Sequence, residues 1–165
     1  MRNLILVAFV ETVAEGLIFP RSDWPLHITL LRFDVEPSED ADVAEYLGEL
    51  VNAPAKGALG AALTVGSDAG FGHQGSIPVS LIERHPILQG LHEELFDAVA
   101  RIGGRVATPH YVLDNYRPHI SHHDGKRPKP GDAVVLDNIA LVDMAPQGNH
   151  TIRQVLKLWH LTPDS

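Results

Sequence analysis

The chain has 165 residues, of which 44% are hydrophobic and 21% are charged, as is ordinary for a globular domain. Its formal net charge of −8 argues against broad binding to nucleic acid, which rests on many Lys and Arg contacts to phosphates. The absence of cysteine excludes disulfides and thiolate metal sites, and no stretch approaches the ~20 apolar residues of a membrane-spanning helix. We therefore expect one monomeric cytoplasmic domain, spanning residues 1–165, that does not act at a membrane.

Two strands are predicted near the start of the chain. Asn3–Val10 is a continuous aliphatic run, which indicates a buried strand. Leu26–Phe33 alternates, so that His27 and Thr29 lie on one face while aliphatic residues lie on the other. The apolar face of this second strand should pack against the core.

Two helices are also predicted. Ser38 is suited to cap the first helix, and Pro54 should end it near Asn52 because proline disrupts a helix interior. The second helix covers Pro86–Ile102, where apolar residues recur at helical spacing and a pair of glycines follows. Both helices are amphipathic and should cover a sheet.

The rest of the chain predicts further strands. They are Gly57–Val65, Ile77–Glu83, His119–His122, Ala133–Asp143 and Ile152–Leu161. The Gly-rich stretch Gly66–Gly75 is expected to be a loop. This order of strands and helices predicts an α+β domain made of two similar halves.

Two short stretches of the sequence resemble each other: Pro25-Leu26-His27-Ile28-Thr29-Leu30 and Arg117-Pro118-His119-Ile120-Ser121-His122. Each contains a histidine, an isoleucine and a hydroxyl residue in that order. Residues two apart on a strand point the same way, so each copy presents an imidazole and a hydroxyl side by side. Two such strands facing each other would place four polar groups around one pocket.

Four such groups suit attack on a phosphodiester. One neutral imidazole can remove a proton from water or a ribose hydroxyl while the other, protonated, donates to the departing oxygen. The hydroxyls of Thr29 and Ser121 can donate hydrogen bonds to phosphate oxygens. With ordinary histidine pKa values, the rate should depend on pH as a bell with limbs on either side of neutrality.

The paired His-x-Thr/Ser motifs resemble those of the 2H phosphoesterase superfamily, which includes cyclic phosphodiesterases, RNA 2′,5′-ligase-like proteins and phage enzymes that destroy cyclic oligonucleotide signals. The resemblance implies a bilobal, pseudo-twofold fold, with antiparallel sheets around a central cleft and helices outside. It implies a metal-independent site in which His27 and His119 are catalytic and Thr29 and Ser121 hold the phosphate. Which histidine is the acid and which the base is left open.

The resemblance also implies the substrate class. We expect hydrolysis, rather than ligation, of a cyclic or 2′-linked phosphodiester in a nucleotide, cyclic oligonucleotide or RNA end. The site of action would be the host cytoplasm if a phage encodes the chain. No cofactor is expected.

Six further residues are candidates for substrate binding: Trp24, Phe71, Tyr116, Arg117, Lys126 and Arg127. The aromatic rings could stack on a base, and the cations could contact phosphate. Packing in the core or rim is the alternative for the rings, and solvated surface charge for the cations. The basic window 117–129 lies beside only the second motif, which predicts that the second half anchors the substrate more firmly.

Two other functions are open. His119, His122 and His123, with Asp124, could bind a transition metal in a metal-dependent hydrolase, although a straight strand would point His122 away from His119. The same cleft could instead belong to a non-catalytic nucleotide-binding module.

Overall fold

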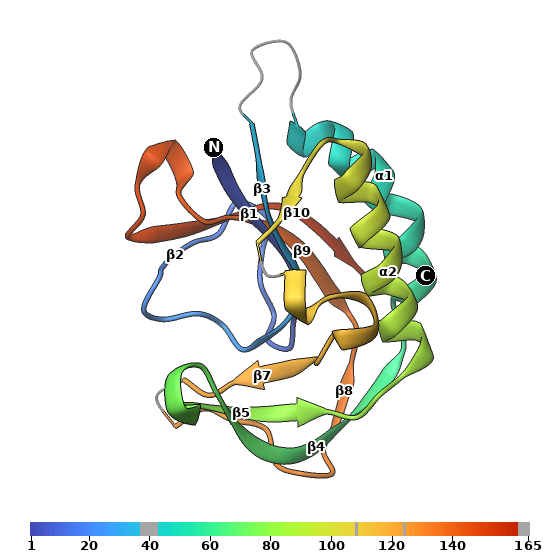
Figure 1. Ribbon diagram of the computed structural model, residues 1–165, viewed down its shortest axis with the longest axis vertical. Coiled ribbons are helices and arrows are strands. Elements are labelled where there is room, and N and C mark those ends of the chain that lie inside the picture. Colours follow the sequence, from blue (N-terminus) through green and yellow to red (C-terminus); the bar gives the residue numbers. More distant parts are fainter. Residues whose placement is uncertain (37–42, 108, 124, 162–165) are drawn as a thin grey trace.

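The computed structural model describes residues 1–36, 43–107, 109–123 and 125–161. Within them, ten strands form one antiparallel sheet in the order β2-β10-β9-β1-β3-β7-β5-β4-β8, with β6 paired to β3 (Figure 1). The strands are β1 (Arg2–Phe9), β2 (Ile18–Pro20), β3 (His27–Val35), β4 (Ala62–Phe71), β5 (Ile77–Ile82), β6 (Arg105–Val106), β7 (His119–Ser121), β8 (Ala133–Val135), β9 (Asn138–Asp143) and β10 (Ile152–His160).

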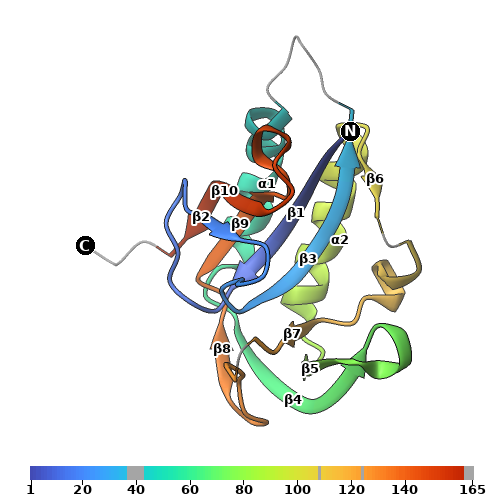
Figure 2. The same ribbon diagram turned by 90° about the vertical axis from the view of Figure 1, so that its left-hand side faces the viewer.

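Two α-helices among these residues, α1 (Val43–Ala58) and α2 (Pro86–Arg101), pack together on one side of the sheet. In Figure 2 they lie behind β1 and β3, while the segment that carries β2 lies in front. Short 3-10 helices are η1 (His73–Gly75), η2 (Pro109–Tyr111), η3 (Leu113–Asn115) and η4 (Pro146–Gly148). No helix in the described ranges is both long and apolar enough to cross a membrane.

The sheet consists of two groups of strands that meet at one place. Strands β2, β10, β9, β1 and β3 form the first group, and β7, β5, β4 and β8 form the second. The groups join where Ile28 of β3 pairs with Ile120 of β7. Figure 1 shows the second group running across the lower end of the first, so the sheet curls. This architecture confirms the predicted α+β fold with antiparallel strands and outer helices.

The two faces of the first group carry separate cores. Ile28 and Ile120 are fully buried in the main core, on the face that the helices cover. A smaller core on the other face includes Phe9, Phe19 and Trp24. Because neighbouring residues of a strand point to opposite faces, the His and Thr/Ser side chains of both motifs point away from the helices.

The first predicted helix ends later than expected. The prediction that Pro54 ends it was wrong, because α1 continues to Ala58 with Pro54 inside. Val51, Ala55 and Ala58 are buried against the main core on either side of Pro54. Their burial offsets the hydrogen bond that proline cannot make. The predicted cap, Ser38, lies outside the described residues.

The glycine-rich region is also different from the prediction. Gly57–Val65 was expected to be a strand and Gly66–Gly75 a loop, but α1 runs into the former and β4 occupies 62–71. β4 pairs with β5 up to Phe71 and Ile77, with Gly70 opposite Pro78, so the first half of the stretch lies in a strand. A Cβ on Gly70 would lie 2.4 Å from the Gly75 carbonyl oxygen, so this tight hairpin requires glycine.

The predicted strand Ala133–Asp143 is two strands. β8 pairs with β4 of the second group, whereas β9 pairs with β1 of the first. The chain thus crosses between the groups at residues 136–137. The other strands and the second helix lie close to their predicted positions, with His85 accepting a hydrogen bond from Ile87 N–H at the start of α2.

Candidate active site

The two motifs form a square of side chains on one face of the sheet. In an antiparallel pair centred on Ile28 and Ile120, His27 lies opposite Ser121 and Thr29 lies opposite His119. Side chains directly opposite each other have Cβ atoms about 4.5–5.5 Å apart, and diagonal neighbours lie about 7–8 Å apart. Each histidine therefore has one hydroxyl next to it on its own strand and another across from it.

Both histidine rings are fixed in the same way. Nδ1 of His27 lies 2.9 Å from the Pro25 carbonyl oxygen, and Nδ1 of His119 lies 2.9 Å from the Arg117 carbonyl oxygen. A carbonyl only accepts, so each Nδ1 carries the proton and each Nε2 is left with a lone pair in the neutral ring. Among the described residues, neither Nε2 has a hydrogen-bond partner.

Burial makes both rings weak bases. It lowers the pKa of His27 from 6.5 to about 4, and the charges of His123 and His119 act in the same direction, against the hydrogen bond to Pro25. Burial also lowers the pKa of His119, and the charge of Arg117 adds to this effect. The unbound site therefore favours two neutral imidazoles at neutral pH.

A cavity of about 420 Å³ adjoins one edge of the square. Thr29 and His119 line it together with Phe71 from the end of β4 and with Tyr111, Val112 and Tyr116 from the segment that precedes β7. Arg32 of β3 and Arg117 also line it, so positive charge comes from both groups of strands. Its position allows a group attached to a phosphate above the square to lie in the cavity.

The aromatic candidates occupy different environments. Phe71 lies in the cavity, with its ring 4.2 Å from that of His119 and 4.9 Å from the Arg117 guanidinium carbon. Trp24 is buried in the smaller core, 4.5 Å from the ring of His27. Tyr116 is buried, and its hydroxyl donates to the Thr29 carbonyl at 2.7 Å. Burial raises the pKa of Tyr116, which keeps this hydroxyl a donor.

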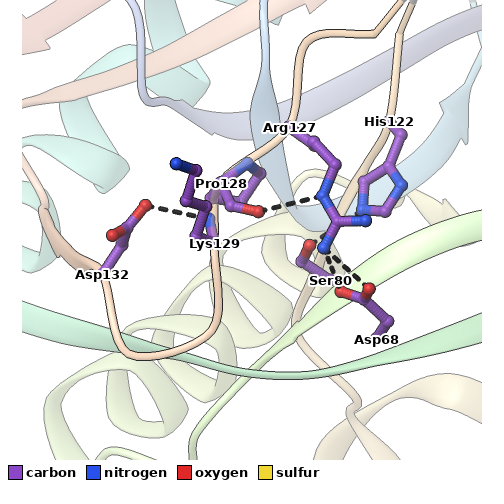
Figure 3. A network of polar contacts seen from close by, with 7 residues as sticks. All are labelled: Asp68, Ser80, His122, Arg127, Pro128, Lys129 and Asp132. Carbon is purple, nitrogen blue, oxygen red and sulfur yellow. Dashed lines mark hydrogen bonds and ion pairs between the residues drawn. The ribbon is translucent and has the colours of Figure 1, made fainter.

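The basic residues after the second motif form ion pairs. Lys126 Nζ lies 3.2 Å from a carboxylate oxygen of Glu11, which also accepts from the Leu26 N–H. Arg127 Nη2 donates to both carboxylate oxygens of Asp68, at 2.6 and 2.7 Å (Figure 3). These ion pairs connect the segment after β7 to both groups of strands: Lys126 connects it to the first group and Arg127 connects it to the second.

The Arg127 pair belongs to a larger polar network. Ser80 Oγ lies 2.8 Å from His122 Nε2 and also contacts Asp68 (Figure 3). Ser80 pairs with Ile120 across β5 and β7, so this network lies on the opposite face from His119 and Ser121. Ser80 is fully buried and lies between the acid and the histidine, which does not match a nucleophilic serine activated by histidine.

The structure does not gather the histidines of the metal hypothesis. His122 turns to Ser80, whereas the Nδ1 of His119 is engaged by the Arg117 carbonyl. In the described part of the chain, no group of three or more His, Asp or Glu side chains could hold a metal ion. Asp124 lies outside that part.

One histidine of the cavity wall was missed from the sequence. His92 of α2 is fully buried, with Nδ1 2.7 Å from the Leu30 carbonyl oxygen and Nε2 accepting from the Leu113 N–H at 2.8 Å. Its ring stacks on Tyr116 at 4.0 Å. The sequence could have indicated its burial, because His92 lies one turn after Leu88 on the apolar face of the helix. It joins α2 to the backbone of the first motif.

Comparisons with solved structures show the class of fold. E. coli LigT complexed with 3′-AMP has a TM-score of 0.61 at 17% identity, covering 98% of this chain and 99% of LigT. The protein TT0787 of Thermus thermophilus has a TM-score of 0.56 at 20% identity, covering 98% of each chain. A phosphoesterase structure has a TM-score of 0.58 at 17% identity, covering 98% and 99%. No curated protein sequence matches the chain.

The sequence identifies the family. The family model of the 2′-5′ RNA ligase superfamily matches residues 7–153, which include both motifs. The chain belongs to this superfamily of 2H phosphoesterases, as its two motifs predicted. Membership assigns it phosphodiesterase-type chemistry.

Proposed function

We propose that the protein is a metal-independent phosphodiesterase that hydrolyses a cyclic or 2′-linked phosphodiester of a nucleotide, an oligonucleotide or an RNA end. The observation that carries this proposal is the square formed by His27, Thr29, His119 and Ser121 around the Ile28–Ile120 pair. Two imidazoles, each with an Nε2 that has no partner among the described residues, and two hydroxyls lie around this pair. They match the needs of one phosphodiester.

We assign the base to His27 and the acid to His119. With a pKa of about 4, His27 is neutral at physiological pH, and its Nε2 can take a proton from the attacking water. His119 borders the open cavity, where a bound phosphate raises its pKa and favours the charged ring. Its Nε2–H then donates to the ribose oxygen as the P–O bond breaks, which yields a phosphomonoester.

The hydroxyls of Thr29 and Ser121 donate to the non-bridging phosphate oxygens, on which negative charge builds in the transition state. The Tyr116 hydroxyl donates a hydrogen bond to the Thr29 carbonyl, which helps to fix the position of Thr29. The cavity beside Thr29 and His119 then takes the nucleoside. E. coli LigT, which has the same fold, is found in complexes with 3′-AMP, NADP+ and ATP, which supports a nucleotide as ligand.

Turnover separates this proposal from a non-catalytic nucleotide-binding module. The purified protein is incubated in EDTA with 2′,3′-cyclic nucleotides, 2′,5′-linked dinucleotides and cyclic di- and trinucleotides. We expect at least one to be hydrolysed, and we expect His27→Asn and His119→Asn each to lower kcat by about 100-fold or more. His73→Asn, at an exposed turn residue, is the matched control. If wild type turns over no substrate faster than a variant that carries both His27→Asn and His119→Asn, only the non-catalytic binding module remains.

A further inference from the structure

Three arginines gather on the face of the sheet that carries the motif side chains. Arg32 lies on β3, Arg153 lies on β10, and Arg21 directly follows β2. β2 pairs with β10 so that Phe19 is opposite Arg153, and the Arg21 N–H donates to the Thr151 carbonyl at 3.0 Å. Arg21 and Arg32, from one part of the sequence, and Arg153, more than a hundred positions further on, therefore bring positive charge to one place in an acidic chain.

Among the residues that the structure describes, no carboxylate forms an ion pair with any of these three arginines. The carboxylate that acts on Arg153 is that of Asp143, and it already lies 3.2 Å from the guanidinium of Arg2. Burial, followed by the charges of Arg32 and Arg21, lowers the pKa of Arg153. The guanidinium group of Arg153 is thus repelled by those of Arg32 and Arg21, and an anion placed between them would reduce that repulsion.

Arg153 is held ready for such an anion. Its Nη1 donates to the carbonyl oxygens of Met144, His150 and Ile152. Its Nε is buried without a hydrogen-bond partner, and its Nη2 also has none in the described part of the chain. A guanidinium group that backbone carbonyls already hold in place loses little conformational entropy when it binds a ligand.

The arginines lie next to the first motif. Arg32 lines the cavity together with Thr29, and its Nε donates to Asn3 at 3.3 Å. The guanidinium carbon of Arg153 lies 6.0 Å from the centre of the Trp24 ring, which in turn lies 4.5 Å from that of His27. By contrast, the cations Lys126 and Arg127 that follow the second motif are paired with carboxylates.

We propose that Arg21, Arg32 and Arg153 form a second anion site, which binds a phosphate of the substrate other than the one that is cleaved. This inference rests on the proposed function and narrows its substrate class. The substrate would be a nucleotide with at least two phosphates, and not a bare nucleoside 2′,3′-cyclic phosphate. Its second phosphate would be a terminal monoester or the next phosphodiester of an oligonucleotide.

Binding of product-like nucleotides tests the second site independently of turnover. Titration calorimetry compares three probes: 3′-AMP, with one phosphate; adenosine 3′,5′-bisphosphate, with a second terminal phosphate; and the dinucleotide ApAp, with a second phosphodiester. We expect one of the two-phosphate probes to bind wild type at least about tenfold more tightly than 3′-AMP, the size of a charge-assisted contact. Which of the two binds more tightly identifies the source of the phosphate.

Exposed arginines supply the variants. Arg21→Gln should reduce the preference for the second phosphate by about three- to tenfold, and change 3′-AMP binding less than twofold. Arg32→Gln should also reduce this preference by about three- to tenfold. Arg101→Gln, at the exposed end of α2, should change neither. Two results would overturn the second site. One is equal affinity of wild type for all three probes; the other is an Arg21→Gln variant that loses the same affinity for 3′-AMP as for the two-phosphate probes. Neither result would affect the proposed function, which turnover decides.

Discussion

The pKa of His27 predicts how the stability of the protein depends on pH. The folded pKa of about 4 lies below the ordinary value of 6.5, so between these values the unfolded chain binds more protons than the folded one. The free energy of unfolding should therefore fall as pH decreases from about 7 to about 4. Each pKa unit corresponds to about 1.4 kcal/mol, which gives about 3 kcal/mol for His27.

The substitution His27→Asn isolates this contribution. Asparagine keeps an amide N–H that can reach the Pro25 carbonyl, but it does not titrate. We expect urea unfolding to show that wild type loses about 3 kcal/mol more than His27→Asn between pH 7 and pH 4. His73→Asn, the same substitution at an exposed residue, is the matched control. The buried residues His92 and His119 are present in all three proteins, so the effects of their own burial cancel; the difference that remains includes the charge interaction between His119 and His27.

Parallel stability curves for wild type and His27→Asn would refute the reasoning. They would mean that His27 titrates alike in the folded and unfolded chains, and hence that burial does not hold its ring neutral. The assignment of His27 as the base would then lose its support. NMR titration of the His27 ring protons provides a direct second reading of the same pKa.

Three other predictions follow from the site and the fold. kcat/KM should rise with pH through about 4, where His27 loses its proton and becomes a base. It should fall again before pH 6.5, because His119 has a lowered pKa and loses the proton that it must donate. A maximum above pH 7 would contradict this. Tyr116→Phe should lower the unfolding free energy by about 1–2 kcal/mol, measured in urea, because the Thr29 carbonyl loses its donor. Pro54→Ala should raise the melting temperature, with a gain of about 1–2 kcal/mol; no gain would show that α1 accommodates the ring without strain.

The sequence predicted the local geometry of the site because that geometry depends on strand periodicity. Alternation puts His27 beside Thr29 and His119 beside Ser121, and the apolar residue between each pair has to be buried. It does not determine which strands become neighbours. The pairing of Ile28 with Ile120 joins strands about ninety positions apart, and it depends on how both groups of strands pack against the helices.

The sequence could not show which basic side chains are neutralised, because their carboxylate partners lie far away along the chain. The basic window 117–129 predicted a substrate held mainly by the second half. Lys126 meets Glu11 and Arg127 meets Asp68, partners that lie 115 and 59 positions away. Conversely, Arg153 is more than a hundred positions from Arg21 and Arg32 in the sequence, so the three form no basic window and only the sheet brings them together.

Packing explains the errors in the predicted elements. Pro54 and the Gly-rich stretch carry local signals against a helix and a strand, respectively. Burial of Val51 and Ala55 keeps α1 intact, and the hairpin with β5 supplies the hydrogen bonds that β4 needs. Tertiary contacts therefore outweigh residue propensity at both places.

A crystal structure of the protein with a bound 3′-nucleotide tests the central claim most directly. The account predicts one phosphate with oxygens about 2.6–3.2 Å from Nε2 of His27, Nε2 of His119 and the hydroxyls of Thr29 and Ser121. The nucleoside should lie in the cavity beside Phe71. A phosphate that contacts only one motif, or that binds away from the Ile28–Ile120 pair, would contradict it.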